Sequence, residues 1–293
     1  MRIGIDAMIL SGRDTGVGVW TRGLIGSLAR LGGGNEYVIY HGPRAGPLPP
    51  LASPNARYVC VRTLASARLF RILWEQVLLP SRVRRDGIEV LHCPAYVRPL
   101  RVGVPTVLTL HDLFALTHPQ FCKRLNVLHY RLALPPGIRR ASVIHCTSEW
   151  TKAALAREFG AAAERAHVVH PGVDDIFRAD GDESGSEALP ARLGLKKPPF
   201  LFVGNVEPKK NVPGLLAAYA ELKRRFGTER KLLLVGGPGW RRRTTPARVD
   251  RLSRRGDVVQ AGYVERTRLP GLYRAALALV FPSLCEGFGL PPL

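Results

Sequence analysis

Short apolar runs alternate with segments of helical period along nearly the whole chain. Eleven runs are typical of strands: RIGIDAMIL, EYVIYH, RYVCV, IEVLHC, PTVLTLH, SVIHCTS, HVVH, FLFVGN, KLLLVGG, DVVQAG and LALVFPS. Alternation of apolar strands with amphipathic helices indicates βαβ units and parallel sheets. The fold class we expect is therefore α/β, with two Rossmann-like parallel-sheet domains.

Apolar residues at helical spacing predict the helices between these strands. One set precedes a glycine triplet at residues 32–34, and its members are Val17, Trp20, Leu24, Leu28 and Leu31. A second set precedes Gly227, and its members are Leu215, Tyr219, Leu222 and Phe226.

One composition shift interrupts the series, at residues 180–198, DGDESGSEALPARLGLKKP. The segment is acidic, contains glycine and serine, and offers little to bury. It predicts a domain over residues 1–180, a linker over 181–198 and a second domain over 199–293. The Asp-x-Asp pattern can bind a divalent metal, but a polar linker is a poor place for such a site, and we expect no metal.

Charge is the unusual feature of the composition, because 43 basic residues against 23 acidic ones give a net charge of +20. Such a field attracts nucleic acid, anionic membrane or phosphorylated ligands. The chain has neither zinc-finger spacing nor an RNP-like aromatic pattern, and its arginine clusters do not form one stripe, so nucleic acid is not the expected partner.

Several global features indicate a cytoplasmic protein. No apolar stretch reaches the roughly 18 residues of a membrane span, and MRIGIDAMIL is too short for a secretion signal. The five cysteines are scattered and form no C-x-x-C pair, which predicts reduced, mostly buried thiols.

Ligands of open parallel sheets bind at the carboxyl ends of strands, so the loops there are the candidate sites. Gly16 and Gly18 open the first helix and allow a phosphate to approach its N-terminus, although a plain turn is an equal alternative. A dinucleotide fingerprint would need glycine at Thr21. His111 and Asp112 end another apolar run, either as functional groups or as a satisfied structural pair.

Two loops in the second half carry stronger signals. In FLFVGNVEPKKNVPGLL a strand ends at Gly204, and Lys209 and Lys210 precede a helix that begins near Asn211 or Val212. Lysines oppose the helix dipole there, and a bound phosphate would reverse that cost. In PSLCEGFGLPPL, glycines can direct backbone N–H groups to a ligand and Glu286 can accept hydrogen bonds from sugar hydroxyls, the alternative being a structural turn.

The motifs TGVGVWTRGLI, TLHDLF, HPGVD, EPKKN and GYVERTRLPGLYRAALALVFPSLCEGFGLP, in this order, resemble family 4 glycosyltransferases of GT-B fold, in particular the bacterial mannosyltransferase-like and polysaccharide-assembly group. Two departures stand out. Lys209 occupies a position where that subgroup commonly has arginine, and the second glutamate of the family's Glu-x7-Glu motif would follow Leu293. The resemblance therefore implies an incomplete, C-terminally truncated second domain.

The resemblance implies a retaining, metal-independent hexosyltransferase without a cofactor. It would move a sugar, mannose being one candidate, from a nucleoside-diphosphate sugar to a saccharide or lipid-linked hydroxyl acceptor, with the donor between the two domains. The implied catalytic residues are Lys209, Lys210, Glu286 and His111. The implied donor-binding residues are Gly16, Gly18, Gly204, Asn205, Tyr263, Val264, Gly287, Phe288, Gly289 and Leu290. An inactive sugar-nucleotide-binding remnant and a sugar-nucleotide epimerase are the alternatives.

The segment SARLFRILWEQVLLPSRVRR, residues 66–85, interleaves arginine with large apolar side chains. A core-packed amphipathic helix is one interpretation. The other is that part of its surface docks on anionic membrane, which would place the protein at the inner face of the membrane as a peripheral protein.

Overall fold

The computed structural model describes residues 1–11, 16–31, 33–51, 54–61, 68–178, 192–237, 239 and 255–293. It divides the chain into two compact units, Met1–Gly172 (unit 1) and Val173–Leu293 (unit 2). Most of the segment expected as a linker, the Asp-x-Asp pattern within it and the arginines at 241–243 lie outside the described residues.

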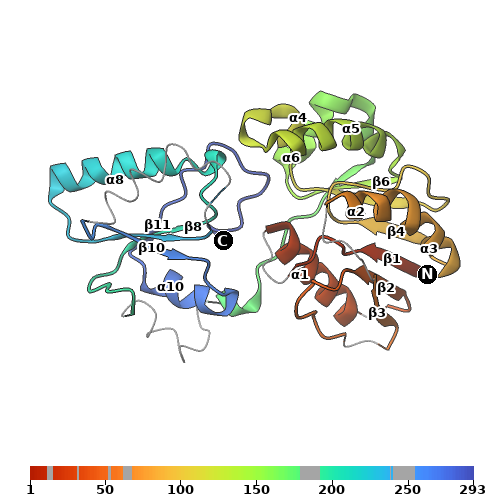
Figure 1. The fold of residues 1–293 in the computed structure, drawn as a ribbon, viewed down its shortest axis with the longest axis horizontal. Helices are drawn as coiled ribbons and strands as arrows, with labels where there is room; N and C mark the ends of the chain where they lie inside the picture. Colours follow the sequence, from red (N-terminus) through yellow and green to blue (C-terminus); the bar gives the residue numbers. More distant parts are fainter. Residues whose placement is uncertain are drawn as a thin grey trace. The chain divides into compact units, whose positions relative to one another are not determined.

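Unit 1 is built on one parallel sheet of seven strands, in the order β3-β2-β1-β4-β5-β6-β7 (Figure 1). The strands are β1 (Arg2–Asp6), β2 (Glu36–His41), β3 (Ala56–Cys60), β4 (Val90–Cys93), β5 (Thr106–Leu110), β6 (Val143–Cys146) and β7 (Ala166–Val168). All seven positions match an expected apolar run. The predicted α/β class and the parallel pairing are confirmed.

Helices cover both faces of this sheet, because alternate strand residues face opposite ways. The helices are α1 (Gly16–Leu31), α2 (Arg68–Leu73), the π-helical turn η1 (Trp74–Leu78), α3 (Leu79–Arg85), α4 (Phe114–Thr117), η2 (Pro119–Phe121), α5 (Arg124–Arg140), α6 (Glu149–Phe159) and η3 (Gly160–Arg165). Ile25 of α1 packs with Ile5 and Ile39 on one face. Helices α3, α5 and α6 pack on the other face, where Ile138 meets Leu108.

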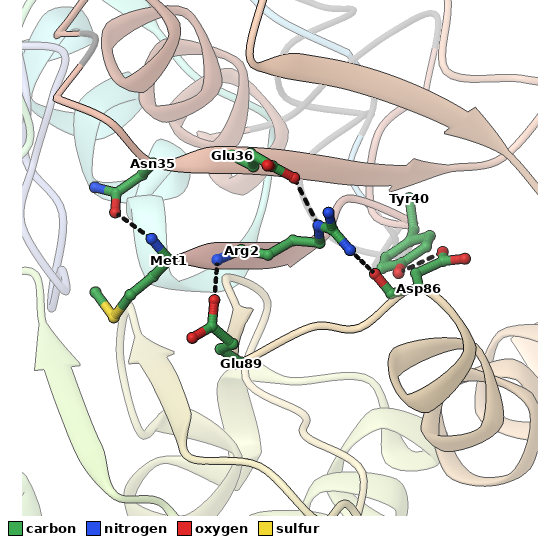
Figure 2. A network of polar contacts seen from close by, with 7 residues as sticks. All are labelled: Met1, Arg2, Asn35, Glu36, Tyr40, Asp86 and Glu89. Carbon is green, nitrogen blue, oxygen red and sulfur yellow. Dashed lines mark hydrogen bonds and ion pairs between the residues drawn. The ribbon is translucent and has the colours of Figure 1, made fainter.

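A polar network ties the first strand to its neighbours at the amino end of the sheet (Figure 2). The Arg2 side chain donates to Glu36 Oε2 at 2.6 Å and to the Asp86 carbonyl at 3.0 Å, while its backbone N–H donates to Glu89 Oε2 at 2.6 Å. Tyr40 donates its hydroxyl to Asp86 Oδ2 at 2.8 Å. The contacts hold the edge opposite the candidate site, so they have a structural role.

Unit 2 contains a parallel sheet of four strands in the order β10-β9-β8-β11. The strands are β8 (Phe200–Val203), β9 (Leu232–Val235), β10 (Val258–Gly262) and β11 (Ala278–Leu279), and the described helices are η4 (Asp175–Phe177), η5 (Pro208–Lys210), α8 (Val212–Phe226), η6 (Arg266–Arg268) and α10 (Leu269–Ala275). Leu216 of α8 packs with Phe202 on one face, and Leu272 of α10 packs with Leu201 on the other.

Two expectations about burial are wrong. Leu31 and Phe226, the last members of the two predicted apolar stripes, are exposed, and each is the last residue of its helix. Of the five cysteines, which are all free, only Cys93 and Cys146 are buried; both lie in central strands, whereas Cys60 on the edge strand β3 is exposed.

Candidate active site

The lysine turn of unit 2 follows β8 and leads into α8. Lys210 ends the short helix η5, and its Nζ atom lies 2.6 Å from Glu286 Oε1. The two side chains are only 13% and 19% exposed, and Nζ also lies 4.7 Å from the centre of the Phe281 ring. Two of the residues expected to be catalytic therefore meet in one largely buried ion pair.

Glycines bring the backbone close to this ion pair. Gly204 has φ +153°, and a Cβ there would lie 3.5 Å from Lys210 Cε. Gly289 has φ +93°, which disfavours other residues, and a Cβ there would lie 3.7 Å from Phe281. The Leu284 N–H donates to the Lys209 carbonyl at 2.8 Å, so the loop after β11 folds back on the lysine turn.

The other residues expected at the donor site are spread over unit 2. Asn205 accepts a hydrogen bond from the Gly237 N–H at 3.1 Å, which ties the end of β8 to the end of β9. Gly287 is buried, whereas Phe288 and Leu290 are half-buried. Tyr263 is half exposed after β10, and the adjacent Val264 packs in the cluster beneath α10.

In unit 1, His111 follows β5 and has one fixed tautomer. Its Nε2 lies 2.9 Å from the Pro94 carbonyl. Because a carbonyl oxygen only accepts, Nε2 carries the proton and Nδ1 keeps a lone pair. Burial lowers the pKa of His111 to about 4, although the bond to Pro94 opposes this shift. At neutral pH the ring is an uncharged hydrogen-bond acceptor.

Trp20 of α1 lies among three histidine rings at the carboxyl ends of the central strands. Its ring stacks on His145 at 5.3 Å and meets His111 edge-on at 4.9 Å and His92 edge-on at 6.3 Å. Each histidine belongs to or follows a different strand of the sheet. The first helix is thereby anchored over the group that includes His111.

A directional chain of hydrogen bonds links two of these histidines. His145 Nε2 lies 2.9 Å from the Val169 carbonyl and must donate to it, so Nδ1 accepts from the Thr109 hydroxyl at 3.1 Å. The Thr109 oxygen then accepts from His92 Nε2 at 2.8 Å. Burial lowers the pKa of His92 to about 4 and also lowers the pKa of His145. The cluster is held neutral and rigid.

Tyr96 adds backbone strain beside His111. Its φ of +69° is unusual for a bulky residue, and its ring centre lies 5.5 Å from that of His111. The Tyr96 hydroxyl donates to Asp112 Oδ2 at 3.0 Å. Asp112 thus positions Tyr96 against the histidine, and strained residues of this kind concentrate at functional sites.

The glycine turn expected to contact phosphate is described only from Gly16 onward, because residues 12–15 lie outside the description. Gly16 begins α1 and is exposed, and no described atom lies within 4 Å of the place a Cβ would take. Gly18 is buried in the first turn. Open space at a helix N-terminus is compatible with an anion there.

A second buried polar group lies at the end of β1. Arg71 Nε lies 3.0 Å from Glu75 Oε1 in the helical segment that contains the π turn. Burial raises the pKa of Glu75 to about 8 and the pKa of Asp6 to about 6, against the attraction of Arg71. Arg98 is buried, and its Nε and Nη1 have no hydrogen-bond partner among the described residues.

Sequence patterns missed four of these residues: Trp20, His92, His145 and Phe281. A signal existed for the histidines, because β4 and β6 end in the similar sequences VLHC and VIHC. Thr109 lies between them on the same face of the sheet, so strand alternation together with the order β4-β5-β6 brings the three polar side chains together.

Comparison with protein-family models identifies the family of the chain. A family model described as Glycosyltransferase Family 4 matches residues 15–176, and one described as Glycosyl transferases group 1 matches residues 187–293. The chain belongs to Glycosyltransferase Family 4. The resemblance carried by the sequence motifs is confirmed.

Curated relatives of this family member are longer than the chain. The O-antigen chain mannosyltransferase B of Escherichia coli is 31% identical over 207 residues, which cover 70% of this chain and 53% of the relative. A D-inositol 3-phosphate glycosyltransferase of Acidothermus cellulolyticus is 31% identical over 277 residues, covering 85% of this chain and 57% of the relative. The chain spans little more than half the length of these two.

Solved structures share the fold of this family member. Anabaena HepE in complex with UDP-glucose superposes with a TM-score of 0.69 at 18% identity, covering 99% of this chain and 76% of that one. WaaG, a glycosyltransferase involved in lipopolysaccharide biosynthesis, gives 0.70 at 17% identity, covering 97% and 76%. The two-sheet architecture is that of the GT-B glycosyltransferases.

Proposed function

We propose that the protein is a retaining hexosyltransferase that moves a sugar from a nucleoside-diphosphate sugar to a hydroxyl acceptor. The observation that carries the proposal is the Lys210–Glu286 ion pair, buried in a glycine-lined turn at the carboxyl ends of unit 2's strands. A buried ion pair has to offset the desolvation of both charges, so its presence beside glycine backbone at the carboxyl ends of strands supports a ligand site.

The chemistry needs positive charge where the leaving group forms. Departure of the diphosphate builds negative charge on its oxygens, and fixed cations in a site of low dielectric constant stabilise that charge without a metal. Lys210 and Lys209 supply the cations in this proposal. Backbone N–H groups of residues 287–290 contact phosphate and sugar, and Glu286 orients Lys210 while it accepts from a sugar hydroxyl.

His111 has a complementary role on unit 1. Its unprotonated Nδ1 can accept a hydrogen bond from a sugar or acceptor hydroxyl but cannot donate one. The proposed role is to orient a hydroxyl. The packing of Trp20 and Tyr96 restricts the ring to that orientation.

For the substrates, we place mannose first, because the Escherichia coli relative named a mannosyltransferase covers most of this chain. Anabaena HepE was solved with UDP-glucose, so uridine donors belong in the same test as guanosine donors. The proposed acceptor is a growing glycan or lipid-linked saccharide, with the protein at the inner face of the membrane.

The test is transfer of labelled sugar from a panel of GDP- and UDP-sugars to glycan acceptors, with and without a chelator. We expect transfer that persists in the chelator and a product that keeps the donor's anomeric configuration. Lys210→Ala should lower turnover by about 10²–10³-fold at saturating donor. The exposed Lys196→Ala is the matched control and should leave turnover unchanged. Unchanged turnover in Lys210→Ala would refute the assigned role.

A further inference from the structure

Helix α5 exposes an unusual surface. Three of its leucines are strongly exposed, at 73% for Leu125, 59% for Leu128 and 70% for Leu132. Every other exposed residue of the helix is an arginine, the set being Arg124, Arg131, Arg139 and Arg140. The spacing of the leucines, i, i+3 and i+7, places them in one stripe along the helix.

The opposite side of α5 is fixed in the core of unit 1. Leu134 and Ile138 are fully buried there and pack with strand residues such as Leu108 and Leu110. The exposed leucines are therefore surplus to the core, since the helix already has a complete packed face. Exposed apolar stripes of this kind mark interaction sites.

The part of the sequence that contains helix α5 has no acidic residues. No aspartate or glutamate occurs between Asp112 and Glu149, while Lys123 and the four arginines of α5 lie within that interval. Helix α8 of unit 2 differs, because its exposed Arg224 and Arg225 both pair with Glu221. The charge on α5 is uncompensated along its own helix, which favours an anionic partner.

The helical segment at residues 66–85 is less suited to this role. Trp74, Leu79 and Val83 are buried in the core, so its main face packs inward as the core-helix interpretation expected. Leu73, Val77 and Leu78 are exposed at 49%, 56% and 41%, each less than any of the three leucines of α5, and Arg71 pairs with Glu75. Helix α5 carries the stronger apolar and basic surface.

We infer that α5 is a docking surface for an anionic lipid membrane, lying in the plane of the interface with Leu125, Leu128 and Leu132 inserted and the arginines on headgroup phosphates. Apolar area and basic charge on one exposed face are the two terms that bind interfacial helices. Nucleic acid would use the arginines and leave the leucines in water. The inference rests on the proposed peripheral location, and not on sugar transfer.

Crossing the bilayer is a different mode of attachment. In the part of the chain that the structure describes, no helix has both the length and the apolar character to span a membrane.

Co-sedimentation with vesicles of phosphatidylcholine and phosphatidylglycerol tests the inference. Leu125→Gln/Leu132→Gln removes two exposed leucines, and Leu31→Gln/Phe226→Gln removes two equally exposed apolar side chains elsewhere, at 76% and 75%. We expect the α5 variant to bind at least tenfold more weakly, because both apolar chains leave the interface. The control should bind like the original protein. Equal binding of all three proteins, or equal loss in both variants, would overturn the inference.

Charge is tested on the same helix. Arg124→Gln/Arg131→Gln should weaken binding to the anionic vesicles by roughly thirtyfold, at about five- to sixfold for each arginine. Binding that does not depend on phosphatidylglycerol content, or that follows added DNA while ignoring the leucine substitutions, would contradict a lipid surface.

The experiments distinguish failure of membrane docking through α5 from failure of the proposed sugar transfer. Far-UV circular dichroism should be unchanged in the α5 variants, since all four substituted side chains are exposed. Transfer to a water-soluble acceptor should also be unchanged in Leu125→Gln/Leu132→Gln, while Lys210→Ala should bind vesicles normally. Loss of vesicle binding in an active enzyme supports docking through α5. Normal docking without transfer by the unsubstituted protein would refute only the proposed activity.

Discussion

The two units use different side-chain chemistry at the ends of their strands. All eight histidines lie at or before residue 170, in unit 1, whereas six of the eight lysines (196, 197, 209, 210, 223 and 231) lie in unit 2. Around His111 the groups are neutral, aromatic and tightly packed. Around Lys210 they are charged and bordered by glycine backbone.

This difference indicates a division of roles. The neutral His111, held by a carbonyl group, can discriminate among hydroxyl groups, because its ring accepts at one defined atom, Nδ1. A cation beside bare backbone instead suits phosphate, which takes both charge and N–H donors. Backbone changes should therefore disturb unit 2 most, and acid should disturb unit 1.

The largest expected effect comes from closing the glycine backbone of unit 2. Gly236 has φ +140°, and a Cβ there would lie 2.1 Å from the Gly204 carbonyl oxygen. Gly236→Ala adds a backbone clash to an unfavourable backbone angle, so we expect unit 2 to lose at least about 4 kcal/mol of stability. Hydrogen exchange resolved by segment would show the loss in β8 and β9 while β4 and β5 remain protected.

A matched control separates the clash from the backbone angle. Gly227 ends α8 with φ +62°, and no described atom lies within 4 Å of its would-be Cβ. Gly227→Ala should cost only about 1 kcal/mol, the ordinary penalty of a left-handed alanine. If both variants lost the same stability, the close approach of Gly204 and Gly236 would have no energetic meaning.

Between pH 6.5 and 4.5, acid is expected to act chiefly on unit 1, which holds the buried histidines. Burial lowers the pKa of His92 and His111 to about 4, while an unfolded histidine has a pKa near 6.5. Between these values the unfolded chain binds more protons, so stability is complete above about pH 6.5 and falls toward pH 4. At about pH 5 the loss should be about 2 kcal/mol for each ring.

The measurement needs two substitutions, because two buried carboxyl groups of unit 1 act in the opposite direction. Burial raises the pKa of Glu75 to about 8 and that of Asp6 to about 6, so their contributions to stability are complete at low pH and are lost as pH rises through 6 and 8. In Asp6→Asn/Glu75→Gln, unit 1 should become less stable from pH 6.5 to 4.5, and unit 2, which has no histidine, serves as internal reference. NMR titration of the rings with pKa values near 6.5 would contradict the buried neutral cluster.

Sequence patterns predicted the eleven strands and a helix beginning near Asn211 or Val212, where α8 begins at Val212, because strand alternation and helix caps are local signals. They also selected Lys210 and Glu286, which lie 76 residues apart and meet in the structure. Trp20 was read only as a core position. Its contacts with three histidines depend on the order in which β4, β5 and β6 join the sheet, which no local pattern encodes.

Burial was the weaker part of the prediction. Hydropathy assigned Phe226 to a core stripe, yet this last residue of α8 is 75% exposed. Hydropathy also did not predict that three leucines of α5 lie on the surface. A periodic apolar pattern identifies one face of a helix but does not say whether that face is buried.

The smallest expected effect concerns the Lys210–Glu286 ion pair. It tests whether charge matters in unit 2, in contrast to the neutral histidine cluster of unit 1. Lys210→Met keeps the packing of the stem on Phe281 but leaves Glu286 without its cation, and Glu286→Gln does the converse. Because both groups are largely buried, a double-mutant cycle on urea unfolding should give a coupling of about 1 kcal/mol, which falls only partly in about 1 M salt. Zero coupling would mean that Lys210 is held by packing alone. In that case Glu286 would not orient the lysine, and the two residues would contact a donor independently.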